Sequence, residues 1–346
     1  MKTKKFAIAA LAATVLFASC SKENNAVIDN TPGKPASLTI GINAPTRAAG
    51  VLTDGSDNSI GCFKAYVFRG EVLEAIITSA DGTSVSETSK VTTKADALYV
   101  IANANTNSIL GAVTEGTTTK TAFLALADNL LSSGSLNILE SGKVWASSAA
   151  VSLAGKFTES NNYTATESVT VKPVTARINL TIDDQRTNTA AANAFVLTNT
   201  QVLNVAGKAL FVSGTPAFTP VWYTGYAGGL NAAATVMTYF NDTYSSTGHM
   251  FYAFENDGAT YPTIITLVAS NDGGTTLRYF PVQFTTTDAG YVIERGHSYQ
   301  AKVTLTGDAT TDPDIDDPED EVVPVNMTVS VSASPWVMVS DIEKTF

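Results

Sequence analysis

The stretch from 323 to 332 reads Val-Pro-Val-Asn-Met-Thr-Val-Ser-Val-Ser and alternates strictly between apolar residues and Pro or small polar ones. A period of two places every second side chain on one face, which is typical of a β-strand with one dry side. The apolar members are Val323, Val325, Met327, Val329 and Val331. Burying five such side chains contributes roughly 8 to 15 kcal/mol before ordering costs, at about 1.5 to 3 kcal/mol each. The segment is therefore strong enough to join two chains as an added strand.

The rest of the chain also predicts β-structure. Short runs rich in Val, Ile, Thr, Tyr and Phe alternate with clusters of Gly, Asn, Asp and Ser, as in sandwiches and barrels. The clearest runs span 63–68, 98–102, 168–174, 178–182, 263–269, 277–284 and 299–305. One helix is predicted over 120–131, where Phe123, Leu126, Ala127 and Leu130 form an apolar stripe. We expect an all-β protein with two β-sandwich-like domains, a minor helix and a C-terminal donor-strand extension.

The domain boundaries follow from composition. A polar stretch at 159–166 is followed by a strand that stops at Pro173, and we place the boundary between the two domains there. The acidic run after Gly307 has almost no apolar residues and repels itself, which predicts an extended linker. The expected domains are 48–173 and 174–306, followed by a linker at 307–321 and a tail at 322–346.

The first residues have the pattern of a bacterial lipoprotein signal. Lys2, Lys4 and Lys5 precede an apolar run that ends in Leu-Phe-Ala-Ser-Cys20. We expect residues 1–19 to be the signal peptide and Cys20 to carry lipid, although Phe17 stands where Leu is usual. The alternative is an ordinary signal peptide cleaved nearby. No other apolar run is long enough to span a bilayer, so the expected precursor is an outer-membrane lipoprotein held by its lipid.

A second strand-like segment lies soon after this signal. Leu38, Ile40 and Ile42 alternate with small residues, and the loop Pro-Thr-Arg47-Ala48 follows. A basic residue among small neighbours suits a trypsin-like protease, so we expect cleavage between Arg47 and Ala48. The alternative is an ordinary surface arginine. On this hypothesis residues 20–47 are a propeptide, and their strand leaves a groove that the tail of another copy fills, giving a head-to-tail polymer.

Several kinds of chemistry lack a sequence signal. The formal net charge is -11, which argues against nucleic acid as a partner. The only histidines, His249 and His297, lie far apart without neighbouring metal ligands, and no nucleophile elbow or phosphate loop is present. We therefore expect no catalytic residues, no metal and no cofactor, and hence no enzyme. Cys62 is left without an intrachain disulfide partner if Cys20 carries lipid.

Aromatic residues suggest one rival interpretation. Trp222 and Tyr223 lie beside a Gly-rich loop at 225–229 and are the best candidates for a sugar-binding platform. Trp145 and Trp336 are weaker candidates, because aromatic side chains in β-proteins more often belong to the core. The rival function is an outer-membrane-anchored, glycan-binding surface lipoprotein.

The order of several short motifs resembles the fimbrillins, the subunits of type V pili in Bacteroidales. The motifs are the lipoprotein signal, Arg47, Tyr-Val-Ile-Ala-Asn-Ala-Asn at 99–105, Val-Lys-Pro-Val-Thr-Ala-Arg-Ile-Asn-Leu at 171–180, Ile-Glu-Arg-Gly-His-Ser-Tyr at 293–299 and Ser-Pro-Trp at 334–336. The resemblance implies two β-sandwich-like domains, transport as a lipoprotein, proteolytic loss of the first segment and a donor region over 323–339 that includes Trp336.

The expected function is thus a stalk subunit of a cell-surface fimbrium that supports adhesion and biofilm formation. Its expected partners are other copies of the chain, anchor and tip pilins, and a host or bacterial surface ligand.

Overall fold

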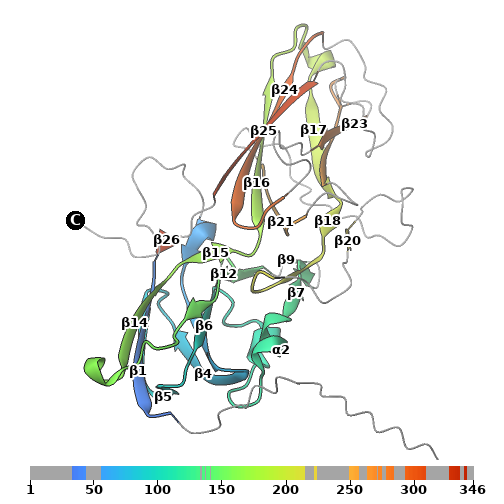
Figure 1. Ribbon diagram of the computed structural model, residues 1–346. Helices are drawn as coiled ribbons and strands as arrows, with labels where there is room; N and C mark the ends of the chain where they lie inside the picture. Colours follow the sequence, from blue (N-terminus) through green and yellow to red (C-terminus); the bar gives the residue numbers. More distant parts are fainter. Residues whose placement is uncertain are drawn as a thin grey trace, which may run out of the picture. The chain divides into compact units, whose positions relative to one another are not determined.

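The computed structural model describes the chain in segments (Figure 1). These are residues 33–43, 56–132, 135–136, 138–140, 142–214, 222–223, 249–256, 263–270, 272–274, 278–283, 293–308, 327–335 and 339–340. Strands dominate these segments and helices are short, so the prediction of an all-β, sandwich-like fold is confirmed.

Two sheets are built from residues before 174. The larger has the order β15-β12-β6-β3-β4, with β13 also paired to β6. Its strands are β15 (Val171–Pro173), β12 (Ala146–Ser148), β6 (Ala97–Ala102), β3 (Phe63–Arg69), β4 (Val72–Ser79) and β13 (Val151–Ser152). The smaller has the order β14-β1-β5 and consists of β14 (Thr164–Val169), β1 (Pro35–Ile42) and β5 (Ser84–Thr92).

Two further sheets follow in the second half of the chain. One has the order β21-β16-β24-β25, from β21 (His249–Ala253), β16 (Ala176–Asp184), β24 (His297–Leu305) and β25 (Met327–Pro335). The other has the order β17-β22-β23, from β17 (Val196–Leu203), β22 (Ile264–Ser270) and β23 (Arg278–Gln283). The last strand of the first half, β15, and the first strand of the second half, β16, are separated by two residues.

The remaining elements are short. Five two-stranded pairs join β2 (Ser59–Ile60) to β26 (Val339–Ser340), β7 (Ala127–Asn129) to β19 (Lys208–Leu210), β8 (Leu131–Ser132) to β9 (Ser135–Leu136), β10 (Leu139–Glu140) to β11 (Lys143–Val144) and β18 (Val205–Ala206) to β20 (Trp222–Tyr223). The helical turns are η1 (Ser56–Asn58), α1 (Ser108–Gly111), α2 (Lys120–Leu124), η2 (Glu159–Asn161) and η3 (Ala191–Asn193).

The prediction of a helix over 120–131 is wrong beyond residue 124. Helix α2 begins after Thr119, whose hydroxyl accepts the Ala122 N–H at 3.1 Å, and it ends at Leu124. Residues 127–129 form a strand instead, and the Leu130 N–H donates to Gly207 O at 2.9 Å. A spacing of four residues between apolar positions fits a strand period of two as well as a helical turn, so the stripe did not distinguish them.

An aromatic cluster fills the core of the first half. The Phe123 ring of α2 lies 4.6 Å from Tyr66 and 5.3 Å from Phe68, centroid to centroid, and Tyr99 is 5.8 Å away. All four rings are buried. The short helix therefore contributes an anchor to the larger sheet.

Candidate functional site

Strand β1 is the central strand of the smaller sheet (Figure 1). It pairs in parallel with β14, from Ser37 opposite Thr164 to Ile42 opposite Val169. It pairs antiparallel with β5 on its other edge. Within the described residues β14 and β5 form a sheet only through β1, so loss of β1 would leave both of them without a ladder.

The apolar side chains predicted for β1 point into the core. Leu38 and Ile40 are both 0% exposed, and Ile42 is half-buried against the same core. Ala36 is also buried, at 3%. Burying the two largest side chains contributes about 1.5 to 3 kcal/mol each, so β1 is a structural part of this domain.

Polar contacts fasten both ends of β1. At its start, the Lys34 Nζ atom lies 2.6 Å from the Tyr163 hydroxyl and 4.8 Å from the ring centroid of the same residue. At its end, the Asn43 N–H donates to Val169 O at 2.8 Å. These contacts are exposed or lie at the strand ends, so each contributes little compared with the buried side chains.

The two ladders of β1 differ in regularity. The ladder with β14 runs without interruption, whereas the ladder with β5 shifts between Ala36 and Leu38, which pair with Val91 and Glu87. A β-bulge of this kind leaves residues of β5 unpaired with β1. The Glu87 carboxylate closes the bulge by accepting the backbone N–H groups of the next three residues, at 2.9, 2.8 and 3.2 Å. These bonds, chiefly that from Ser89, lower the pKa of Glu87.

The tail strand β25 pairs with a sheet of its own chain. It runs antiparallel to β24, from Met327 opposite Leu305 to Pro335 opposite His297, and forms the edge of that sheet. The short strand β26 pairs in parallel with β2. Three of the predicted donor residues, Met327, Val329 and Val331, therefore lie in a strand that is already paired within the same chain. Val323, Val325 and Trp336 lie outside the described residues.

Other predicted sites also fall outside the described segments. These are Cys20, Arg47 and Ala48, with residues 309–321 of the expected linker. Cys62 is half-buried and forms no disulfide within the described residues. The same segments contain no helix long and apolar enough to cross a membrane, and no cluster of three or more metal-ligating side chains.

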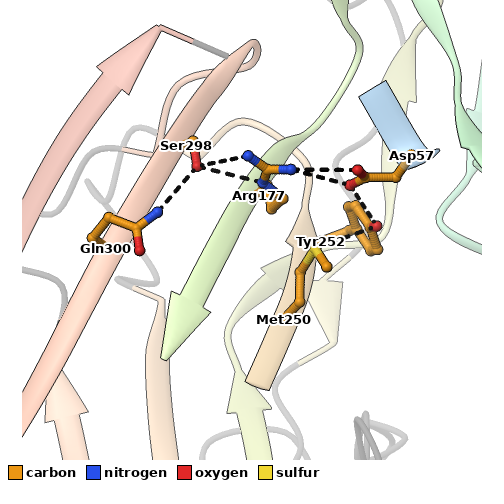
Figure 2. A network of polar contacts seen from close by, with 6 residues as sticks. All are labelled: Asp57, Arg177, Met250, Tyr252, Ser298 and Gln300. Atoms are coloured by element: carbon orange, nitrogen blue, oxygen red, sulfur yellow. Dashed lines mark hydrogen bonds and ion pairs between the residues drawn. The ribbon is translucent and has the colours of Figure 1, made fainter. Parts of the chain in front are cut away.

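A buried ionic network that the sequence analysis did not single out lies at the start of β16 (Figure 2). Arg177 is 2% exposed, and its Nη1 atom lies 3.4 Å from both carboxylate oxygens of Asp57 in η1. The Tyr252 hydroxyl donates to Asp57 Oδ2 at 2.9 Å, and Ser298 Oγ accepts from Arg177 Nη2 at 3.3 Å. Burial and the Asp57 carboxylate raise the pKa of Tyr252, so its hydroxyl stays protonated as a donor.

Asn103 holds the residues that follow Asp57. Its backbone is left-handed, with φ of 58°, a conformation that Asn tolerates better than most residues. Its Nδ2 atom donates to Ser59 O at 2.8 Å and to Val144 O at 2.9 Å, and its Oδ1 atom accepts the Gly61 N–H at 3.0 Å. The segment 57–61 is therefore fastened to β6 and β11 by one buried amide.

Three of the motifs behind the fimbrillin resemblance contribute to these contacts. The 99–105 motif contributes Asn103, the 171–180 motif contributes Arg177 and the 293–299 motif contributes Ser298. The last motif also contributes Arg295, whose Nη2 atom donates to Leu210 O at 2.8 Å and to Val174 O at 3.3 Å. These motifs are thus structural, since they hold the segments that connect the sheets.

The structure describes the candidate residues of the rival sugar site only in part, because the Gly-rich loop at 225–229 and Trp336 lie outside the described residues. Trp145 is 4% exposed and its ring centroid lies 5.3 Å from that of Phe211, so it belongs to the core. Trp222 and Tyr223 form β20, which pairs with β18. His297 begins β24, and its Nδ1 atom lies 3.3 Å from Arg295 O, which is consistent with a structural role.

Comparison with known proteins identifies the family. Residues 175–336 match the family described as FimA-like major fimbrial subunit protein, C-terminal domain. The match includes β25 as well as the sheet that it joins.

Solved structures extend the likeness to the first half. A proposed cell adhesion protein from Bacteroides eggerthii DSM 20697 is 29% identical, with a TM-score of 0.72 over 90% of this chain and 99% of that chain. The fimbrilin FimA from Porphyromonas gingivalis W83 shares the fold at 19% identity, with a TM-score of 0.57 over 88% and 99% of the two chains. The tip fimbrial protein Mfa3 from Porphyromonas gingivalis matches at 13% identity, with a TM-score of 0.50 over 87% and 99%. Residues 175–336 therefore belong to the FimA-like major fimbrial subunit family, and the chain is a fimbrillin of the Bacteroidales type.

Proposed function

We propose that this fimbrial subunit is a stalk pilin that polymerises by exchange of β-strands between copies. It is exported as a lipoprotein through Cys20 and cut after Arg47, and the tail of the next copy then replaces β1. The observation that carries the proposal is the central place of β1 between β14 and β5. A cut at Arg47 separates this strand from the rest of the chain.

Loss of β1 would leave unpaired backbone groups and open apolar sites that another strand can fill. The backbone groups of β14 and β5 that pair with β1 would face solvent, and the sites of Leu38 and Ile40 would empty. Unpaired strand edges and open apolar surface are the usual template for strand addition. A strand of alternating apolar residues from another copy satisfies both needs.

The tail suits this role because it loses only one ladder when it leaves its own sheet. Strand β25 lies at a sheet edge and pairs only with β24 among the described strands. In the place of β1 it would pair with β14 on one side and with β5 on the other. The transfer therefore exchanges one ladder for two. Val323, Val325 and Trp336 supply further apolar residues to the donor region by sequence.

A subunit with both a removable strand and a donor tail occupies the stalk. Its groove and its tail are different surfaces, so each contact is head to tail and the assembly continues as a filament on the cell surface. The partners are further copies, with anchor and tip pilins at the two ends. The role is structural, in adhesion and biofilm formation, and involves no catalysis.

The test is limited trypsin treatment of the chain from residue 20 onward, followed by size analysis and electron microscopy. The cut wild-type chain forms a ladder of higher species and filaments. Arg47→Ala stays monomeric because β1 remains attached, whereas Arg47→Lys keeps a trypsin site and assembles. Filaments from Arg47→Ala would contradict the proposal, and so would a wild-type chain that is cut and remains monomeric.

A further inference from the structure

We infer that the tail strand of a second copy enters the place of β1 in the direction opposite to that of β1. This inference rests on the proposed strand exchange and specifies its geometry. The β1 slot is defined here as the position between β14 and β5 that β1 fills.

The first argument is the order of side-chain sizes along the slot. The core-facing residues of β1 are Ala36, Leu38, Ile40 and Ile42, so one small residue precedes three large ones. The Ala36 site is buried at 3% exposure, and a larger side chain there would overpack the core. The slot therefore requires a strand with its small residue at the end that Ala36 occupies.

The tail has the same series in reverse. At alternate positions, residues 327 to 333 read Met-Val-Val-Ala, three large residues followed by one small. Entered backwards, this series places Ala333 at the Ala36 site and Met327 at the Ile42 site. Entered forwards, every alternating series that starts at 323, 325, 327 or 329 places Val or Met at the Ala36 site.

The second argument comes from the two ladders of the slot. The uninterrupted ladder, on β14, is parallel, and the bulged one, on β5, is antiparallel. A reversed strand would be antiparallel to β14 along the uninterrupted edge and parallel to β5 over 84–87. Antiparallel pairing is slightly the more stable per residue. The reversed donor thus has the more stable antiparallel pairing along the uninterrupted ladder, and the parallel pairing falls on the bulged one.

The third argument concerns the place of Gly41. A Cβ atom built there would meet nothing within 4 Å, so the slot accepts a side chain at this position. Glycine weakens a strand interior because it loses the most backbone freedom on folding. The reversed tail places Thr328 there, a β-branched residue that suits a strand.

Crosslinking between two distinguishable chains tests the direction. Both begin at residue 20 and carry Cys20→Ser and Cys62→Ser, so that the introduced thiols are the only ones. The acceptor is cut after Arg47 and carries a cysteine on β14. The donor carries Arg47→Ala, which retains its own β1, and a cysteine in the tail. A short thiol-to-thiol crosslinker then joins neighbouring positions in the heterodimer.

The pattern of crosslinks reports the direction. Thr164 and Ser168, both exposed, lie opposite the two ends of the slot, beside Ser37 and Gly41. We expect Thr164→Cys to join Ser332→Cys, and Ser168→Cys to join Thr328→Cys. The exchanged pattern, with position 164 joined to 328 or position 168 joined to 332, overturns the inference.

A central pair of cysteines distinguishes a wrong direction of insertion from an absence of strand exchange. Thr166→Cys and Ser330→Cys lie at the middle of the slot and of the inserted strand, so they join in either direction at this register. A heterodimer with the exchanged end pattern overturns the direction alone. Absence of any heterodimer in size analysis overturns strand exchange, and the direction with it.

A size substitution provides an independent readout. Ala333→Leu in the donor places a large side chain at the Ala36 site and lowers the yield of heterodimer about tenfold or more. Ser334→Leu is the matched control, because Pro35 at the corresponding place is exposed. Equal yields from the two variants contradict the reversed alignment.

Discussion

Arg177 is buried in a strand whose neighbours Ala176 and Ile178 are also buried and apolar. Sequence patterns marked this residue only as part of a motif, because its carboxylate partner Asp57 lies 120 residues earlier. No period or spacing reports such a pair. A strongly polar residue within an apolar strand was the one available signal, since a buried guanidinium requires partners.

Removal of the Asp57 carboxylate should be costly, because it takes the negative charge away from the buried Arg177 guanidinium. We expect Asp57→Ala to lower the free energy of unfolding by about 3 to 5 kcal/mol. Tyr252→Phe removes one hydrogen bond to the same carboxylate and should cost about 1 to 2 kcal/mol. Urea denaturation measures both. The double variant Asp57→Ala/Arg177→Met should recover much of the loss, and an Asp57→Ala protein as stable as wild type would contradict this account of the network.

At the scale of elements, alternation was enough to predict strands at both ends of the chain. The strand at Leu38 to Ile42 and much of the strand after Val323 exist as β1 and β25. Their pairing was not predictable. A period of two in the sequence indicates that a strand has one apolar face, but it does not identify the neighbouring strand. The pairing of β25 with its own β24 is the main feature that the sequence did not indicate.

The bulge in β5 predicts a pH dependence for the hold on β1. Hydrogen bonds lower the pKa of Glu87 in the folded chain, so the stabilisation is complete above its ordinary value of 4.5. It is lost as the pH falls through the lowered value. After the cut at Arg47, we expect the β1 peptide to stay bound at pH 7 and to dissociate faster as the pH falls below 4.5 and through the lowered pKa of Glu87. Size exclusion with mass spectrometry measures this release.

Two variants make that test specific to the bulge. Glu87→Gln keeps the size of the side chain and removes its charge, so release should be faster at pH 7 and should change less with acid. Glu71→Gln is the control, because Glu71 also has a lowered pKa, but through Thr121, and lies away from the slot. An acid response that is the same in Glu87→Gln and wild type would assign the effect to other carboxylates.

At the scale of the whole molecule, the proposed acceptor and the proposed donor lie on different sheets. The slot belongs to the sheet of β14 and β5, and the tail belongs to the sheet of β24. While β1 fills the slot, the monomer offers no vacancy to the tail of another copy, so on the proposed mechanism it stays unassembled before cleavage. On the proposed mechanism, assembly is a competition between β1 and the tail of another copy for one slot.

This competition can be shifted by strengthening β1 itself. Gly41 is the weak point of β1, because it adds no side chain in a strand interior where a Cβ atom has room. Gly41→Val should stabilise the bound strand by about 0.5 to 1 kcal/mol, and filament growth after trypsin cleavage should be about two- to fivefold slower by light scattering. Gly111→Ala in α1, where a Cβ atom also meets nothing within 4 Å, is the matched control and should leave the rate unchanged. Growth at the wild-type rate in Gly41→Val would mean that β1 leaves before the tail arrives, and that displacement does not limit assembly.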